Sequence, residues 1–217
     1  MKALTQNIFK KYKRVASLPG FHFSILGAVL FLGVSLCINF YAGIYATVSA
    51  NNPVTDIILS NIPVYNVDAI FVYGAILLCV SIFFLCIINP EKIPFTVKTI
   101  ALFVIVRSLF IILTHIGPYP NHTDLTLKLI NDFSFDGDLF FSGHTGLPFL
   151  IALIYWDNKF LRRIYIMASI FFAIVVLLGH IHYSIDVFAA FFITEGTYRL
   201  SEKLFKKSYL LSRSTYF

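Results

Sequence analysis

The sequence predicts an all-α, polytopic membrane protein with six transmembrane helices, because its composition is strongly apolar and its apolar residues fall into six long runs. The chain has 217 residues, of which hydrophobic types make up 58% and charged types only 13%. Its mean hydropathy of +0.81 implies more apolar surface than a water-soluble domain of this length can bury. Lipid is therefore expected to solvate the chain.

Each run is near the roughly 20 residues that a helix needs to cross about 30 Å of hydrocarbon. Runs this long lack the alternation of barrel strands, and a backbone in lipid must satisfy its own hydrogen bonds, so we expect helices. No linker separates the runs, so residues 1–217 are expected to form one membrane domain. The expected spans are 21–48, 67–88, 99–116, 139–156, 161–178 and 183–200.

The basic residues predict how these helices are oriented. With six crossings, one side of the membrane holds 15 Lys and Arg residues and the other holds only Lys128. Cytoplasmic loops are enriched in Lys and Arg, so both termini are expected in the cytoplasm. The net charge of +6 then reflects topology and attraction to anionic lipid, and it implies no nucleic-acid partner. The 15 residues are Lys2, Lys10, Lys11, Lys13, Arg14, Lys92, Lys98, Lys159, Arg162, Arg163, Arg199, Lys203, Lys206, Lys207 and Arg213.

Residues 1–18 are expected to form an interfacial helix ahead of the first span. They mix the apolar residues Ile8, Phe9, Tyr12 and Val15 with a basic cluster, which is typical of a helix that lies in the membrane surface. A cleaved signal peptide is not favoured, because the next apolar run is too long and has no clear small-residue cleavage site.

Two polar motifs lie at the starts of the fourth and sixth runs, and the expected topology puts both on the extracytoplasmic side. They are residues 137–145, GDLFFSGHT, and residues 182–186, HYSID. His182 and Asp186 are four residues apart and would share one face of a helix. The carboxylate could then accept the imidazole Nδ1 proton and leave Nε2 as a nucleophile. The alternative is a pair that only satisfies two polar groups near the interface.

The first motif predicts an anion site. Ser142 can cap a helix that begins at Gly143, and the exposed N–H groups of that helix would bind a phosphate, with Gly143 allowing close approach. His144 would lie beside the phosphate as a general acid, although a lone interfacial histidine is the commoner case. Arg107 is the one Lys or Arg deep in a run, closer to mid-membrane than the histidines, and its partner would be a substrate phosphate or a carboxylate such as Asp186.

The remaining polar residues divide by position. Glu195 and Arg199 have the spacing of a structural ion pair near the cytoplasmic end of the last run. His180 can lie in the site or in solvent, depending on the register of the chain. Asp138 belongs to an acidic loop that borders the motifs and could attract a cationic head group. The three cysteines all fall in apolar runs, and no metal-ligand spacing is present.

Together the motifs, from Gly137-Asp138 through Ser142-Gly143-His144-Thr145 to His182-Tyr183-Ser184-Ile185-Asp186, resemble the sphingomyelin synthase branch of the type 2 phosphatidic acid phosphatase superfamily. The resemblance implies that His182 forms a phosphohistidine, that Asp186 orients it and that His144 protonates the departing lipid alcohol. No metal or other cofactor is implied. The residues expected to contact the substrate are Arg107, Asp138, Ser142, Gly143 and Thr145.

The chain departs from the ordinary lipid phosphatases of that superfamily, which carry a Lys and an Arg in a first motif and a Ser-Arg pair ahead of the nucleophile. Here the residues before His182 are Leu178, Gly179, His180 and Ile181. A phosphomonoester carries about two negative charges near neutral pH and needs several cations, whereas a diester carries one. The missing cations favour a phosphodiester lipid.

Three functions follow from these patterns. The first is a lipid phosphotransferase or phospholipase C-like enzyme, with a membrane phospholipid as substrate and water or a lipid alcohol as acceptor. The second is a phosphatase acting on phosphatidate, phosphatidylglycerophosphate or a polyprenyl pyrophosphate. The third is a membrane scaffold or transporter without turnover. The short chain and its modest loops favour a bacterial inner membrane, and the oligomeric state is left open.

Overall fold

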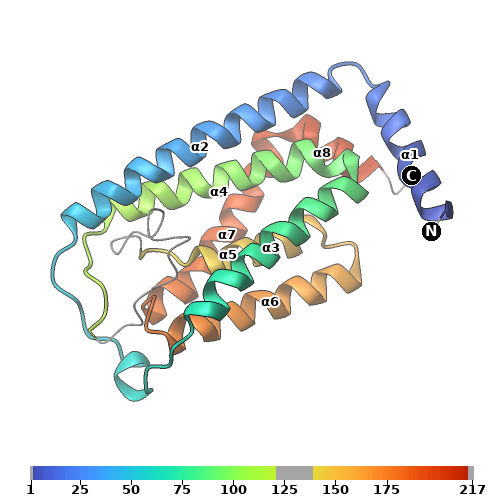
Figure 1. Cartoon of the computed structure of the whole chain (residues 1–217). Coiled ribbons are helices and arrows are strands. Elements are labelled where there is room, and N and C mark those ends of the chain that lie inside the picture. Colours follow the sequence, from blue (N-terminus) through green and yellow to red (C-terminus); the bar gives the residue numbers. More distant parts are fainter. Residues whose placement is uncertain (1, 121–138, 215–217) are drawn as a thin grey trace.

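The protein is helical throughout the part of the chain that the structure describes, residues 2–120 and 139–214 of a computed structural model (Figure 1). No strand occurs in these two ranges, so the all-α prediction is confirmed for them. The six helices that correspond to the expected spans are α2 (Phe21–Ser49), α3 (Asp68–Ile88), α4 (Ile93–Leu113), α5 (Gly143–Ile154), α6 (Lys159–Leu178) and α7 (Ser184–Leu204). The other elements are α1 (Lys2–Ala16), α8 (Lys206–Arg213) and the 3-10 turns η1 (Leu59–Asn61) and η2 (Pro90–Lys92).

Four helical segments are long and apolar enough to cross a membrane by length and composition. They are Phe21–Ser49, Asp68–Ile88, Pro90–Leu113 and Lys159–Leu178. Helix α5 has only 12 residues, and α7 has 21 but carries five charged residues, at positions 186, 195, 199, 202 and 203. An integral membrane protein is therefore supported, while the spans expected at α5 and α7 stay predictions.

Two expected boundaries differ from the observed ones. Helix α4 begins at Ile93 rather than near residue 99. The η2 turn leads into it, and Pro94 favours the first turn of a helix. Polar residues between 93 and 98 interrupt the apolar run, so hydropathy does not show this earlier start. The fourth expected span begins at residue 139, whereas helix α5 begins at Gly143, the start that the Ser142 cap predicts, because Ser142 has an extended backbone. The apolar residues from 139 to 141 thus enter the bundle without helical structure.

The helices form a bundle in which α5 is the most enclosed (Figure 1). Helix α2 packs along α4, while α5 packs against α6 and α7. Five consecutive residues of α5, from Leu150 to Ile154, are buried and belong to the main apolar core. By contrast, Phe23 of α2 is 81% exposed and Phe192 of α7 is 79% exposed. Large apolar side chains this exposed are typical of helices that face lipid.

The connections gather at two ends of the bundle, which we name the basic end and the loop end. The basic end contains α1, η2 and α8, and both described termini lie there (Figure 1). At this end Lys11 Nζ lies 3.7 Å from the buried Glu91 carboxylate, and Lys98 Nζ donates to the hydroxyls of Ser24 and Ser208 at 3.1 Å each. These contacts attach α1 to η2, and α4 to α2 and α8.

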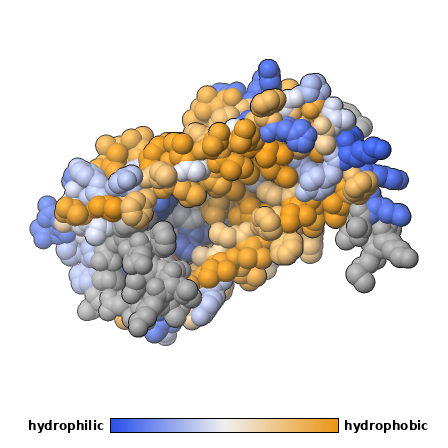
Figure 2. Space-filling view, turned by 45° about the horizontal axis from the view of Figure 1, so that its top comes forward, coloured by the Kyte–Doolittle hydropathy of each residue, from blue (hydrophilic) through white to orange (hydrophobic). Residues whose placement is uncertain are grey.

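The loop end contains residues 50–67, 114–120 and 179–183. Two of these segments are joined by backbone hydrogen bonds from Asn51 N to His115 O at 2.9 Å and from Gly117 N to Asn52 O at 3.4 Å. The loop that follows α2 also reaches the end of α6, where Tyr65 N donates to Leu178 O at 2.8 Å. Figure 2 shows hydrophobic residues over the middle of one face, with hydrophilic residues gathered toward its ends.

Candidate active site

The start of α5 is built as the sequence predicts. Ser142 is the N-cap, and its hydroxyl accepts a hydrogen bond from Thr145 N at 3.4 Å. The Thr145 hydroxyl also lies 3.2 Å from Ser142 Oγ, so both side chains are engaged in the cap and both are buried. The cap fixes the N-terminus of α5 and leaves the helix dipole pointing toward the loop end.

Arg107 lies against this N-terminus. Its Nε donates to Phe141 O at 2.9 Å, and a Cβ placed on Gly143 would lie 3.2 Å from the same Nε. A side chain at position 143 would therefore crowd the guanidinium. This explains why a glycine fits here, in addition to the expected close approach of a phosphate to the backbone.

The position of Arg107 along α4 lets its side chain reach the start of α5. Arg107 lies six residues before the end of α4, about 9 Å at 1.5 Å per residue. Residues 139–142 enter the bundle before α5 begins, so the N-terminus of α5 lies within reach of the guanidinium. The depth expected for Arg107 relative to the histidines stays a prediction.

His182 and Asp186 lie beside each other, as their spacing predicts, although through a different local structure. His182 precedes α7, and Asp186 is the third residue of that helix, where its Oδ2 accepts from Tyr183 N at 2.9 Å. His182 Nδ1 lies 3.5 Å from the same Oδ2 without a hydrogen bond between them, so the predicted Nδ1–H bond stays a prediction. The two side chains are 4% and 1% exposed, so the pair is removed from water. A capping turn, and not one face of a regular helix, brings them together.

His144 stacks on α3. Its ring lies 3.8 Å from the Phe71 ring, measured between centroids, with an interplanar angle of 29°. Phe172 of α6 packs against it at 5.6 Å. Both His182 and Arg107 lie within electrostatic range of His144. The three groups that the sequence assigns to phosphate chemistry are thus neighbours.

A backbone hydrogen bond joins the two motifs directly. Ser142 N donates to Asp186 O at 3.2 Å, so the residue that caps α5 is tied to the carboxylate residue of the pair. Although the motifs are about forty positions apart in sequence, their relative position is fixed by main-chain atoms, which do not depend on side-chain rotamers.

The loop between α2 and α3 contributes residues that belong to neither sequence motif. Asp56 Oδ2 accepts from Ser184 N at 2.7 Å, and its Oδ1 accepts from Ile58 N and Leu59 N at 2.8 and 3.1 Å. The Tyr183 hydroxyl donates to Gly117 O at 2.8 Å and accepts from Val54 N at 3.2 Å. No periodicity or spacing relates an acid at 56 to a helix that starts at 184, so sequence offered no signal for it.

Hydrogen bonds stabilise the Asp56 carboxylate. Burial alone would raise the pKa of this carboxyl, but the backbone N–H groups of Leu59, Ser184 and Ile58 outweigh it, so the pKa lies below the usual 3.8. Asp56 is therefore ionised near neutral pH, and its negative charge lies at the N-terminus of α7, where the helix dipole favours it.

Among the remaining polar residues named from the sequence, those that the structure describes lie outside the contact between the two motifs. Asp138 lies outside the described residues. His180 has a left-handed backbone, with φ of 52°, and packs edge-on to Tyr119 at 5.2 Å. It is buried, and neither ring nitrogen has a hydrogen-bond partner within residues 2–120 and 139–214. The Glu195–Arg199 pair is confirmed, with Arg199 Nε at 2.8 Å from Glu195 Oε1.

Two further features lie outside the proposed chemistry. Among the described residues, no group of three or more His, Cys, Asp and Glu side chains could hold a metal ion.

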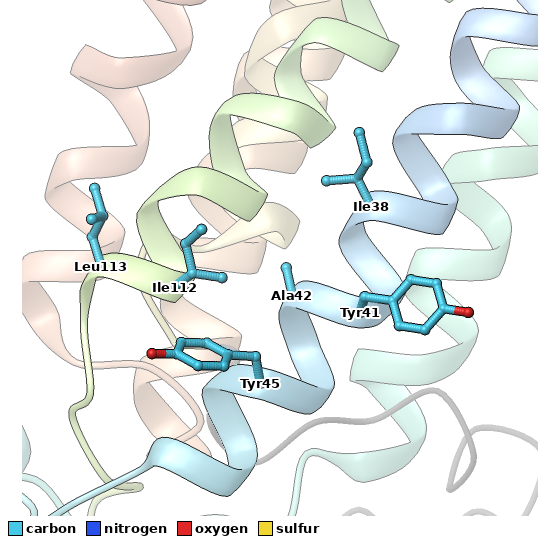
Figure 3. A pocket seen from close by; sticks show the side chains of 6 residues that line it. All are labelled: Ile38, Tyr41, Ala42, Tyr45, Ile112 and Leu113. Atoms are coloured by element: carbon cyan, nitrogen blue, oxygen red, sulfur yellow. The ribbon is translucent and has the colours of Figure 1, made fainter.

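An apolar groove of about 510 Å³ lies between α2 and α4, lined by Ile38, Tyr41, Ala42, Tyr45, Ile112 and Leu113 (Figure 3). Ile112 and Leu113 follow Arg107 by five and six positions and so lie on another face of α4. The groove is separate from the site.

The C-terminal part of the chain matches a known family. Residues 137–203 match the family model described as PAP2 superfamily C-terminal. This match supports the type 2 phosphatidic acid phosphatase superfamily. Members of that superfamily are phosphatases and phosphotransferases, which supports an enzyme. The matched stretch contains His144, His182 and Asp186. No curated protein and no solved structure matches the chain.

Proposed function

We propose that this protein is an integral-membrane lipid phosphotransferase or phospholipase C-like enzyme that cleaves or transfers a phospholipid head group through a phosphohistidine. The observation that carries the proposal is the junction of the two motifs: a buried His182–Asp186 pair, bonded through the backbone to the cap of α5, with His144 and Arg107 beside that cap. A nucleophile with an orienting carboxylate, a second histidine and an anion site are the parts that phosphoryl transfer needs.

In the first step, Asp186 holds the Nδ1–H of His182, and Nε2 attacks the phosphorus of the bound lipid. A P–N bond forms while the P–O bond to the lipid alcohol breaks, and His144 donates a proton to that leaving oxygen. The products are a diacylglycerol-type alcohol and a phosphohistidine that carries the head group. Arg107 and the N–H groups at the start of α5 stabilise the charge on the phosphoryl oxygens.

In the second step, the hydroxyl of an acceptor attacks the phosphohistidine. His144, now neutral, takes the proton from that hydroxyl, and the P–N bond to His182 breaks. Water as acceptor releases a soluble phospho-head-group, whereas a lipid alcohol gives a new phospholipid. The single guanidinium at the cap matches the single negative charge of a diester, which favours phospholipid head groups over phosphomonoesters.

We infer the topology from the two ends of the bundle. All six helices α2 to α7 run between the loop end and the basic end, so the chain 1–217 would cross the membrane six times as one domain. Helix α5 need not match the full hydrocarbon thickness, since its neighbours cover its backbone. The basic end would be cytoplasmic, with α1 in the interface. The site would then face the extracytoplasmic side, in a bacterial inner membrane.

The test is incubation of the purified protein with a panel of head-group-labelled phospholipids, with and without a lipid alcohol acceptor, followed by lipid separation. The proposal expects a soluble phospho-head-group or a new head-grouped lipid, lost in His182→Ala. Free inorganic phosphate from phosphatidate or a polyprenyl pyrophosphate would instead establish a phosphatase. Lipid profiles that His182→Ala leaves unchanged would support a scaffold or transporter.

A further inference from the structure

The turn before α7 is held by two carboxylates from distant parts of the chain. The Tyr183 N–H donates to Asp186 on α7 itself, and the Ser184 N–H donates to Asp56 in the loop between α2 and α3. These two N–H groups directly follow His182 in the sequence. Asp56 is 7% exposed and ionised near neutral pH, so a buried negative charge accepts a hydrogen bond from this turn.

The first N–H groups of a helix have no partner within the helix, and a carboxylate at the third position is a good acceptor for them. Asp186 is at that position, where its Oδ2 accepts from Tyr183 N, while its Oδ1 has no hydrogen-bond partner within residues 2–120 and 139–214. The same Oδ2 lies 3.5 Å from His182 Nδ1. The position of this oxygen relative to the imidazole therefore depends on the geometry of the turn, which a second acceptor, bound to the Ser184 N–H, also fixes.

Asp56 is that second acceptor. Its bond of 2.7 Å to Ser184 N is shorter than the 2.9 Å between Tyr183 N and Asp186. Its second oxygen is held by the N–H groups of Ile58 and Leu59, so the carboxylate is already oriented by its own loop. The loop in turn is anchored by the bond between Val54 N and the Tyr183 hydroxyl.

We propose that Asp56 is a positioning residue for the reaction. By binding Ser184 N–H it fixes the turn that carries His182 and keeps the Asp186 carboxylate directed at Nδ1. Asp56 touches neither the substrate nor the reacting atoms. This inference rests on the proposed function, because it assigns Asp56 a role in the attack by His182.

The experiment compares Asp56→Ala with Asp56→Asn in the full-length protein, using the labelled phospholipid that the wild type turns over. Alanine removes the acceptor, so kcat is expected to fall by at least 10-fold while KM stays within about 3-fold, because the substrate site at α5 is intact. Asparagine retains a carbonyl oxygen that can accept from Ser184 N, so it is expected to restore much of kcat. Equal loss in both variants would overturn the proposal, as would an unchanged kcat in Asp56→Ala.

Ser60→Ala is the matched control, because the Ser60 hydroxyl lies in the same loop and contacts the Tyr119 hydroxyl at 3.0 Å without touching α7. It is expected to leave kcat unchanged. A merely structural role would lower the melting temperature of Asp56→Ala and leave the kcat of the folded fraction at the wild-type value, which would also overturn the proposal.

Amide hydrogen exchange measures the same contact without turnover. In Asp56→Ala, a peptide that spans residues 180–187 is expected to exchange faster than in the wild type, with no such change in Ser60→Ala. Unchanged exchange would refute the positioning role, whatever the substrate. Faster exchange in a protein that turns over no phospholipid would leave the contact established and refute the proposed function alone.

Discussion

Two side-chain pairs with the same four-residue spacing lie at the two ends of helix α7, and their surroundings differ. The His182–Asp186 pair at the loop end is 4% and 1% exposed, and neighbouring loops bond to the turn that holds it. The Arg199–Glu195 pair toward the basic end has a shorter contact of 2.8 Å but is 64% and 38% exposed. Spacing therefore predicts that such a pair forms, and burial together with neighbouring groups decides what it can do.

The largest effect is expected when His144, the neighbour of the buried His182–Asp186 pair, is replaced. His144→Gln is expected to lower kcat by about 10²- to 10⁴-fold, the usual contribution of a general acid, because no group then protonates the leaving lipid alcohol. Steady-state turnover of a labelled phospholipid measures this. A substrate with a more acidic leaving alcohol should recover part of the rate; a loss independent of the leaving group would contradict the assignment.

The second change tests the anion site. Arg107→Gln removes a charge-assisted hydrogen bond worth about 1.5–3 kcal/mol, so kcat/KM is expected to fall by about 10- to 100-fold. Arg107→Lys keeps the charge but loses the planar donor set, and it should fall between glutamine and the wild type. Equal kcat/KM for the wild type, Arg107→Gln and Arg107→Lys would show that Arg107 does not bind the substrate.

The third change concerns the loop that supports the buried pair. Because the pKa of Asp56 in the folded protein lies below 3.8, its ionised form stabilises the fold at neutral pH, and this contribution is lost as the pH falls through the folded-state pKa. The melting temperature of Asp56→Asn should therefore lie below that of the wild type at pH 7. The gap should narrow below pH 3.8. A gap that is constant with pH would show that the charge is not involved.

The smallest effect is expected at the exposed pair. Arg199→Gln breaks contacts with Glu195 and Glu202, but exposed ion pairs contribute about 0–1 kcal/mol. We expect kcat within about 2-fold of the wild type and a small change in melting temperature. A fall in kcat as large as that of His144→Gln would show that the exposed pair matters for turnover as much as the groups at the buried pair.

Local features of the chain could be predicted from sequence, whereas contacts between distant segments could not. The Ser142 cap and the Glu195–Arg199 pair each depend on residues within one helical turn, so spacing alone predicts them. Asp56 and Phe71 meet the motifs only because four helices bring their ends together. The apolar run from residue 139 did not predict how short α5 is, because apolar residues in an extended segment and in a helix have the same hydropathy.

Trapping the covalent intermediate on His182 tests the proposed phosphohistidine. Wild-type protein is mixed with a phospholipid labelled with ³²P at the head-group phosphate, quenched within the first turnover, and digested for mass spectrometry. We expect protein-bound label that is stable to base and labile to acid, as a phosphoramidate is, on the peptide that contains His182. The label should be absent in His182→Ala and retained in Arg199→Gln. Turnover without bound label, or label that persists in His182→Ala, would refute a phosphohistidine at this residue.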